Sequence, residues 1–157
     1  MVRICFVCLG NICRSPTAEG IMLDLVKKAN LDDKIEIDSS GTSAYHVGEQ
    51  ADRRSQATAN KRGIHLPSRS RQFKPVDFTQ FDYVVAMDLS NYNHLMNLRT
   101  NKSQTVYLLR DFDEKSPERA SVPDPYYGGP EGFDRVFDIC LAGCQGLLQQ
   151  IKQQHTL

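Results

Sequence analysis

The sequence lacks the features that would assign it to several specialised classes of protein. Its nineteen basic and nineteen acidic side chains cancel, so the charge balance calls for neither nucleic acid nor an acidic membrane. No apolar stretch approaches the length of a membrane span, and the short apolar N-terminus lacks the layout of a signal peptide. These absences predict a cytoplasmic protein with no nucleic-acid or membrane partner, in which any anion binding is local.

The cysteines also lack the pattern of a secreted disulfide framework. There are five, an odd number, and in a reducing compartment such cysteines are core residues, metal ligands or catalytic thiolates. Cys140 and Cys144 lie one helical turn apart on an apolar face, so we expect them to be buried core residues. A metal site there would need two more ligands nearby. The sequence predicts neither a metal site nor a cofactor.

The chain has the length of one domain, and we expect residues 1–157 to form it without internal repeats or linkers. Apolar or alternating segments typical of strands occupy residues 3–7, 34–40, 83–87 and 105–109. Helical patterns occupy residues 51–63, 89–98 and 133–151, and a further one begins with Ser15 as N-cap and Pro16 as first helical residue. This alternation predicts an α/β fold with a parallel sheet and helices on both faces.

A short loop, FVCLGNICRSPTAEG at residues 6–20, joins the first expected strand to the first expected helix. In parallel sheets ligands bind beyond the carboxyl ends of the strands. A tight loop there turns backbone N–H groups inward, and the helix N-terminus adds partial positive charge. Gly10 allows a backbone conformation that most residues avoid, and Arg14 supplies a planar fork that matches two phosphate oxygens. The pattern predicts a site for a tetrahedral oxyanion.

Cys8 stands at the start of this loop, where the same positive environment favours a thiolate. The Ser15 hydroxyl could donate a hydrogen bond to the sulfur. A nucleophilic cysteine therefore fits the spacing of Cys8 and Arg14, and the alternative is a structural cysteine beside a helix cap.

The segment VCLGNICRSPTAE resembles the N-terminal signature of the low-molecular-weight protein tyrosine phosphatases. The likeness continues through DSSGTSAYHVGEQADRRS, FDYVVAMDLSN and VPDPYYGG, and so covers most of the chain. It implies a four-stranded parallel sheet of flavodoxin-like, doubly wound topology. It also implies metal-free hydrolysis of phosphotyrosine and aryl phosphates through a cysteinyl-phosphate intermediate.

The resemblance implies roles for single residues. Cys8 would be the nucleophile, Arg14 the phosphate clamp and Asp124 the general acid, while Ser15 would tune the thiolate and Asn11 would hold the shape of the loop. The whole phosphate-binding loop would be Leu9, Gly10, Asn11, Ile12, Cys13, Arg14 and Ser15.

The chemistry of the reaction and the neighbouring residues also support Asp124 as the general acid. A phenol oxygen leaves more easily when a carboxylic acid protonates it. Asp124 lies between Pro123 and Pro125, which restrict the backbone. Outside this context, an aspartate between prolines is more often a turn residue.

The resemblance also marks three tyrosines as walls of the substrate pocket, namely Tyr45, Tyr126 and Tyr127. Their rings could stack on an aromatic substrate, and Tyr126 and Tyr127 correspond to a pair that is phosphorylated in some family members. The alternative for this pair is two half-exposed aromatic residues packing a long loop.

Two possible roles remain for each of two further residues, Cys13 and Asp88. Cys13 resembles a redox partner that traps oxidised Cys8 as a reversible disulfide, and its alternative role is to fill space behind the loop. Asp88 could brace Arg14 or the loop, or it could cap the helix that follows.

Three competing functions use the same residues differently. A thioredoxin-coupled arsenate reductase needs relay cysteines, and residues 77–99 contain none. A catalytically dead phosphotyrosine-binding module would be expected to lose Cys8, Arg14 or Asp124. A dithiol redox protein usually has two residues between its cysteines, whereas Cys8 and Cys13 have four between them. We therefore expect a phosphatase whose partner is a phosphotyrosine-containing protein or a small aryl phosphate, acting as a monomer with a weak dimer as the alternative.

Overall fold

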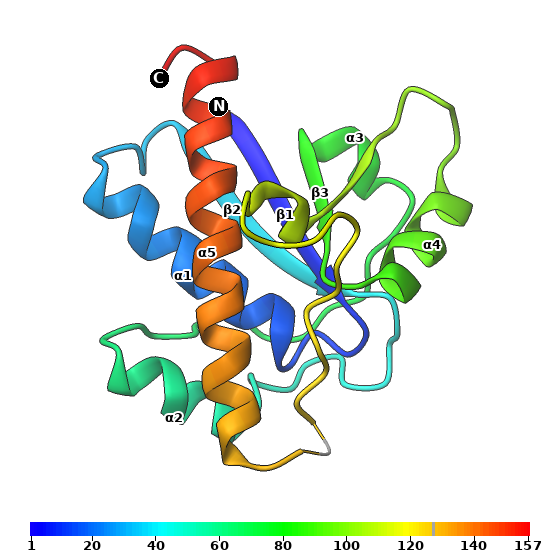
Figure 1. Ribbon diagram of the computed structural model, residues 1–157. Helices are drawn as coiled ribbons and strands as arrows, with labels where there is room; N and C mark the ends of the chain where they lie inside the picture. Colours follow the sequence, from blue (N-terminus) through cyan, green and yellow to red (C-terminus); the bar gives the residue numbers. More distant parts are fainter. Residues whose placement is uncertain (127) are drawn as a thin grey trace.

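Four parallel strands form the centre of the protein, whose computed structural model describes residues 1–126 and 128–157 (Figure 1). The strands are β1 (Val2–Cys8), β2 (Ile35–Gly41), β3 (Tyr83–Ala86) and β4 (Val106–Leu108). They pair in the order β2-β1-β3-β4, and every pair is parallel. The predicted four-stranded parallel sheet is confirmed. The strand order reverses direction between β1 and β3, which is where ligands bind in doubly wound folds.

Helices cover both faces of this sheet (Figure 1). On one face lie α1 (Arg14–Lys28), α2 (Arg53–Lys61) and the long α5 (Pro130–Gln154), and on the other lie α3 (Asp77–Gln80) and α4 (Leu89–Leu98). A short 3-10 turn, η1 (Leu109–Phe112), follows β4.

Strand β1 is apolar along most of its length because it is buried on both sides. Ile4 and Phe6 pack into the core under α1 and α5, while Cys5 and Val7 pack into the core under α3 and α4. All four side chains are fully buried. Burial on both faces explains why the strand reads as a continuous apolar run rather than an alternating one.

The start of α1 differs from the sequence-based prediction. The helix begins at Arg14, and Cys13 rather than Ser15 occupies the N-cap position, without a side-chain capping bond. Ser15 is not a cap because its hydroxyl is engaged with other groups of the loop, as described below. The short helix α3 was not predicted either. The helix over residues 89–98 is confirmed with the expected bounds.

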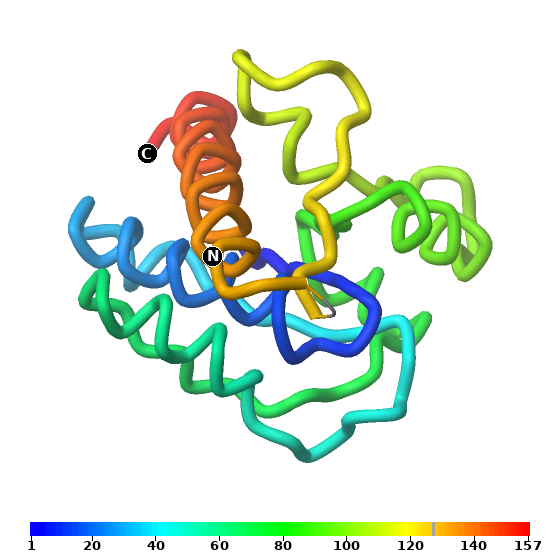
Figure 2. The backbone as a smooth tube through the Cα atoms, turned by 60° about the horizontal axis from the view of Figure 1, so that its bottom comes forward, coloured from blue at the N-terminus to red at the C-terminus, as the bar shows by residue number. Residues whose placement is uncertain are grey.

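The long connection before α5 brings distant parts of the sequence together. In Figures 1 and 2 the yellow segment near residue 120 runs beside the dark-blue loop that joins β1 to α1. A hydrogen bond from Arg14 Nη1 to the carbonyl oxygen of Val122 joins the two segments at 3.1 Å. This path sets residues 122–126 beside the carboxyl end of β1.

Within the two described ranges, no helix combines the length and the apolar character that crossing a membrane requires. Tyr127, predicted to be a pocket wall, lies outside the described residues.

Candidate active site

The loop after β1 owes its shape to Asn11 rather than to Gly10. Asn11 has a φ of 57°, in the left-handed region that asparagine tolerates better than most residues. Gly10 does not have a positive φ, so the expectation that it supplies the special conformation is wrong. Its small size matters for another reason, because a Cβ there would lie 2.9 Å from Cδ2 of His46.

Hydrogen bonds fix Asn11 in this conformation. Its Nδ2 donates to Ser15 Oγ at 2.8 Å and to Ser39 Oγ at 2.9 Å, and its Oδ1 accepts from the backbone N–H of Arg71 at 3.0 Å. The side chain is almost fully buried, so each of these bonds is shielded from water. Asn11 thus ties the loop to α1, to β2 and to the segment at Arg71.

The Cys8 sulfur lies at the floor of the loop, close to two hydrogen-bond donors. Ser15 Oγ is 3.1 Å from the sulfur, and the backbone N–H of Ser15 points to it at 3.4 Å. Because Asn11 already donates to Ser15 Oγ, the hydroxyl hydrogen of Ser15 is left for two acceptors, the Cys8 sulfur at 3.1 Å and the Ser40 carbonyl oxygen at 3.3 Å. The first turn of α1 carries no acidic side chain, so the positive end of the helix is not neutralised there.

Arg14 is buried and held by oxygen atoms from two other segments. Its Nη1 donates to Asp88 Oδ2 at 2.5 Å and to the Val122 carbonyl at 3.1 Å, and its Nη2 lies 3.7 Å from Asp124 Oδ2. Burial alone would lower the pKa of Arg14, but the nearby Cys8 sulfur and the Asp88 carboxylate raise it above its usual value. The guanidinium therefore stays charged and fixed in position.

Asp88 serves both of the roles that the sequence left open. One carboxylate oxygen accepts the hydrogen bond from Arg14, and the other accepts from the backbone N–H of Asn91 at 2.7 Å. Asp88 is thus the N-cap of α4 and also the brace of Arg14.

Asp124 reaches the same pocket from the far end of the sequence. Its side chain is 45% exposed, its Oδ1 accepts from the backbone N–H of Tyr126 at 3.0 Å, and it lines the pocket that contains Cys8 and Arg14. The structure therefore brings together the three residues for which catalytic roles were predicted.

This pocket has a volume of about 420 Å³. Tyr45 and Tyr126 line it together with the loop residues Leu9, Gly10, Ile12 and Cys13. Tyr45 is 85% exposed, so its ring stands at the mouth rather than in the floor. Two lining residues, Ser43 and His46, were not among the predicted site residues. The only sequence signal that His46 lies at the pocket is its position next to Tyr45. The Nδ1 atom of His46 lies 2.8 Å from Glu49 Oε2.

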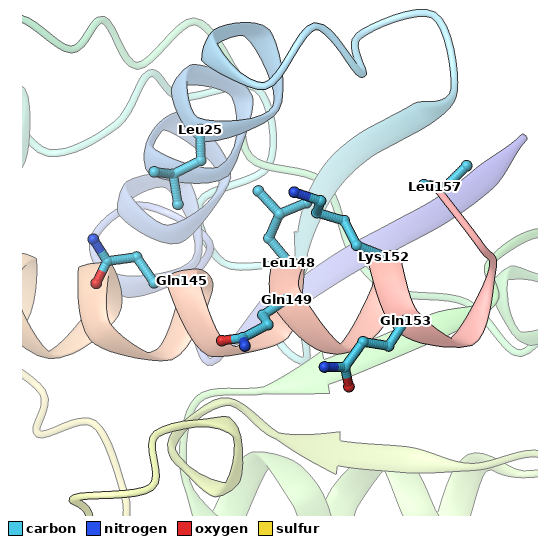
Figure 3. A pocket seen from close by; sticks show the side chains of 7 residues that line it. All are labelled: Leu25, Gln145, Leu148, Gln149, Lys152, Gln153 and Leu157. Carbon is cyan, nitrogen blue, oxygen red and sulfur yellow. The ribbon is translucent and has the colours of Figure 1, made fainter.

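A larger hollow of about 560 Å³ lies between α1 and α5 (Figure 3). Leu25 from α1 and Leu148 from α5 form its apolar floor together with Leu157, and three glutamines and Lys152 surround it. Its described lining residues include no cysteine, no aspartate or glutamate and no predicted site residue. The chemistry points instead to the smaller pocket at Cys8.

The other cysteines are poorly placed to react. Cys140 and Cys144 are fully buried, as predicted, and burial raises the pKa of the Cys140 thiol to about 12. Burial, followed by the charge of Asp52, raises the pKa of Cys13 to about 12 as well. In residues 1–126 and 128–157, no group of three or more His, Cys, Asp or Glu side chains could hold a metal ion.

The chain is similar to known proteins over nearly its whole length. Residues 3–157 match the family described as low molecular weight phosphotyrosine protein phosphatase. A low molecular weight protein-tyrosine-phosphatase of Streptomyces coelicolor is 40% identical over 155 residues, which cover 97% of this chain and 94% of the relative.

Solved structures are similar over nearly the whole chain. The crystal structure of a protein tyrosine phosphatase from Entamoeba histolytica has a TM-score of 0.94 at 40% identity and covers 99% of both chains. A structure described as a drosophila arginine phosphatase has a TM-score of 0.88 at 32% identity and covers 95% of this chain and 97% of its own.

Proposed function

The chain belongs to the low molecular weight phosphotyrosine protein phosphatase family and has its protein-tyrosine-phosphatase activity, and from this premise we propose that Cys8, Arg14 and Asp124 carry out the reaction. The observation that supports the proposal is their convergence. Groups from the end of β1, the start of α1 and the loop before α5 line one pocket, with Arg14 Nη2 3.7 Å from Asp124 Oδ2.

In the first step the Cys8 thiolate attacks the phosphorus atom of the substrate. An S–P bond forms while the bond from phosphorus to the phenolic oxygen breaks, and that oxygen takes the proton of the Asp124 carboxylic acid. Arg14 and the backbone N–H groups of residues 9–14 hold the three other oxygens, on which negative charge is spread in the transition state.

In the second step water releases the phosphate. The Asp124 carboxylate accepts a proton from the water, the water oxygen bonds to phosphorus, and the S–P bond breaks to return the thiolate. The hydrogen bonds that Ser15 directs at the sulfur stabilise this leaving thiolate as well as the attacking one. The products are a phenol and inorganic phosphate.

The pocket walls support an aromatic substrate. Tyr45 and Tyr126 flank the entrance above the loop, where their rings can stack on the phenyl ring of phosphotyrosine. We propose that phosphotyrosine in a protein and a small aryl phosphate both fit, whereas phosphoserine is too short to bring its phosphate to the floor. All of these groups come from one chain, which supports catalysis by a monomer.

Cys13 has a proposed protective role. When a peroxide oxidises Cys8 to a sulfenic acid, the Cys13 thiol displaces water and an S–S bond forms. Because the pKa of Cys13 is about 12, its thiol is neutral at physiological pH and we expect this disulfide to form slowly. After exposure to excess peroxide, dithiothreitol should restore more activity to the wild type than to Cys13→Ser, because an unprotected Cys8 sulfenic acid is oxidised further to the irreversible sulfinic acid. Equal recovery of the two proteins would contradict the protective role.

The catalytic assignment is tested by hydrolysis of an aryl phosphate in the presence of EDTA. The wild type should turn over, Cys8→Ser should be inactive, and Asp124→Ala should lose about 10²–10⁴-fold in rate. A wild type that binds phosphotyrosine without hydrolysing it would contradict the assignment.

Phosphoarginine belongs in the same panel of substrates, because one similar structure is described as an arginine phosphatase. We expect hydrolysis of phosphotyrosine to dominate, since Tyr45 and Tyr126 offer aromatic surfaces to a flat ring. A preference for phosphoarginine would overturn the substrate proposal and leave the cysteine chemistry intact.

A further inference from the structure

We propose that Arg54 is a positioning residue that holds the Asp124 segment against the phosphate-binding loop. The inference rests on the proposed role of Asp124 as the general acid. It assigns a part in the reaction to a surface arginine of α2 that lies outside the pocket lining.

Arg54 connects two segments through its guanidinium group. Its Nη1 donates to the carbonyl oxygen of Tyr126 at 3.0 Å. Its Nε and Nη2 donate to the two carboxylate oxygens of Asp52 at 3.1 and 3.0 Å. This paired geometry uses the planar fork of arginine and fixes its orientation, which a single contact from a lysine would not do.

Asp52 is itself anchored to the phosphate-binding loop. Its backbone N–H donates to the carbonyl oxygen of Ile12 at 2.7 Å, and its side chain caps α2 by accepting from the N–H of Arg54 at 2.8 Å. Burial alone would raise the pKa of Asp52, but the hydrogen bonds from Arg54 lower it below its usual value. Asp52 is therefore charged at neutral pH and held in position, so it anchors the Arg54 side chain.

Ring contacts add to the hydrogen bonds. The guanidinium carbon of Arg54 lies 5.3 Å from the centre of the Tyr126 ring and 4.6 Å from that of Phe133. Tyr126 in turn packs against a small cluster formed by Ile12, Cys13 and Phe133. An isolated surface ion pair contributes little, but here a two-pronged ion pair, a hydrogen bond and two ring contacts act on the same group.

The segment that carries Asp124 needs such support on the side facing α5. On the side facing the sheet, Val122 is held by the Met87 carbonyl and by Arg14. Pro123 and Pro125 have no N–H to donate.

On the side facing α5, Tyr126 donates its N–H to Asp124 Oδ1 at 3.0 Å and its carbonyl oxygen accepts the hydrogen bond from Arg54. The contacts thus run from the loop at Ile12 through Asp52, Arg54 and Tyr126 to the Asp124 carboxyl.

This arrangement predicts a specific kinetic defect when Arg54 is removed. A displacement of about 1 Å in a reacting group can cost about a hundredfold in rate. Within kcat/KM, which covers the steps up to cleavage of the P–O bond, only protonation of the leaving oxygen should suffer, because the Cys8 sulfur and Arg14 are held by other contacts. The defect should therefore grow with the basicity of the leaving group.

The experiment measures kcat/KM for phenyl phosphate, whose leaving group needs a proton, and for dinitrophenyl phosphate, whose leaving group does not. Arg54→Ala should lose about ten- to a hundredfold on phenyl phosphate and less than about threefold on dinitrophenyl phosphate. Arg54→Lys should fall between Arg54→Ala and the wild type, because it keeps the charge but not the fork. The matched control is Arg53→Ala, an exposed arginine in the same helical turn, which should match the wild type on both substrates.

Further variants separate the inference from the function on which it rests. Asp124→Ala should show the same dependence on the leaving group more strongly, and adding Arg54→Ala to it should cause no further loss. If Asp124→Ala shows no such dependence, the proposed general acid is wrong and the inference falls with it. If Asp124→Ala shows it while Arg54→Ala lowers both substrates equally or neither, only the Arg54 inference is overturned. Arg54→Lys gives the same comparison if Arg54→Ala does not fold.

Discussion

Replacing Asp88 separates two contributions that one carboxylate makes to the structure. Its Oδ2 accepts from Arg14 Nη1 at 2.5 Å, and its Oδ1 caps α4 by accepting from the N–H of Asn91 at 2.7 Å. Asp88→Asn keeps an oxygen for the cap and removes the charge that faces Arg14. Asp88→Ala removes both contributions, so the difference between the variants isolates the cap.

The expected magnitudes follow from burial. The Arg14 side chain is 4% exposed and that of Asp88 is 20% exposed, so the pair is only weakly screened by water. Breaking a buried ion pair costs about 3–5 kcal/mol of stability. We expect the lower end, about 3 kcal/mol, for Asp88→Asn, because Asp124 still lies 3.7 Å from Arg14. Loss of the cap in Asp88→Ala should add about 1 kcal/mol.

Urea-induced unfolding at neutral pH measures these changes as free energies of unfolding. Asp113→Asn serves as the control, since Asp113 is a turn aspartate that accepts from the N–H of Lys115, and it should lose no more than about 0.5 kcal/mol. The reasoning is refuted if Asp88→Asn is as stable as the wild type while Asp88→Ala loses about 1 kcal/mol. That result would leave the carboxylate as a helix cap alone.

Two further predictions concern a buried carboxyl group and a close contact of helix α5. Burial raises the pKa of Glu19, so its folded state holds the proton more tightly than the unfolded chain and stability falls as pH rises from the usual glutamate range through the raised pKa. In urea unfolding, the wild type should therefore lose stability from pH ~5 to pH ~8 through the ionisation of Glu19, whereas Glu19→Gln should not. A difference in the free energy of unfolding between the two proteins that is the same at both pH values would contradict this. In α5, a Cβ at Gly146 would collide with the carbonyl oxygen of Phe112. Gly146→Ala should lower stability by about 1–3 kcal/mol, whereas Gly132→Ala, where the nearest atom is 3.7 Å away, should not; equal melting temperatures of the two would disprove the collision.

Sequence patterns predicted the parts of this protein that depend on local periodicity. The apolar run of β1 and the helical spacing of α1 and α5 are visible without a structure because burial imposes a period on each element. The spacing of Cys8 and Arg14, with a strand before and a helix after, likewise predicted an anion site at the end of β1, and the structure brings Cys8 and Arg14 into one pocket there. The ends of the helices were predicted less accurately than their existence. Ser15 was predicted to cap α1, but its hydroxyl is hydrogen-bonded within the loop instead.

Contacts between distant segments could not be read in the same way. Nothing near Asp52 or Arg54 in the sequence indicates that they connect Ile12 with Tyr126, because those partners are distant along the chain. The positive φ of Asn11 likewise depends on partners in β2 and at Arg71.

The sequence by itself determined the strands, the main helices and the loop between β1 and α1 where we propose that phosphate binds, since these follow from local periodicity and from the geometry of a strand that leads into a helix. The tertiary structure alone decided that Asp88 braces Arg14 while capping α4, and that Asp124 lies 3.7 Å from the same arginine. The physical reason is that the order β2-β1-β3-β4 brings the ends of β1 and β3 together, and the long connection after β4 then passes over both. Which side chains meet there depends on strand order and on the path of that connection, and no local pattern contains either.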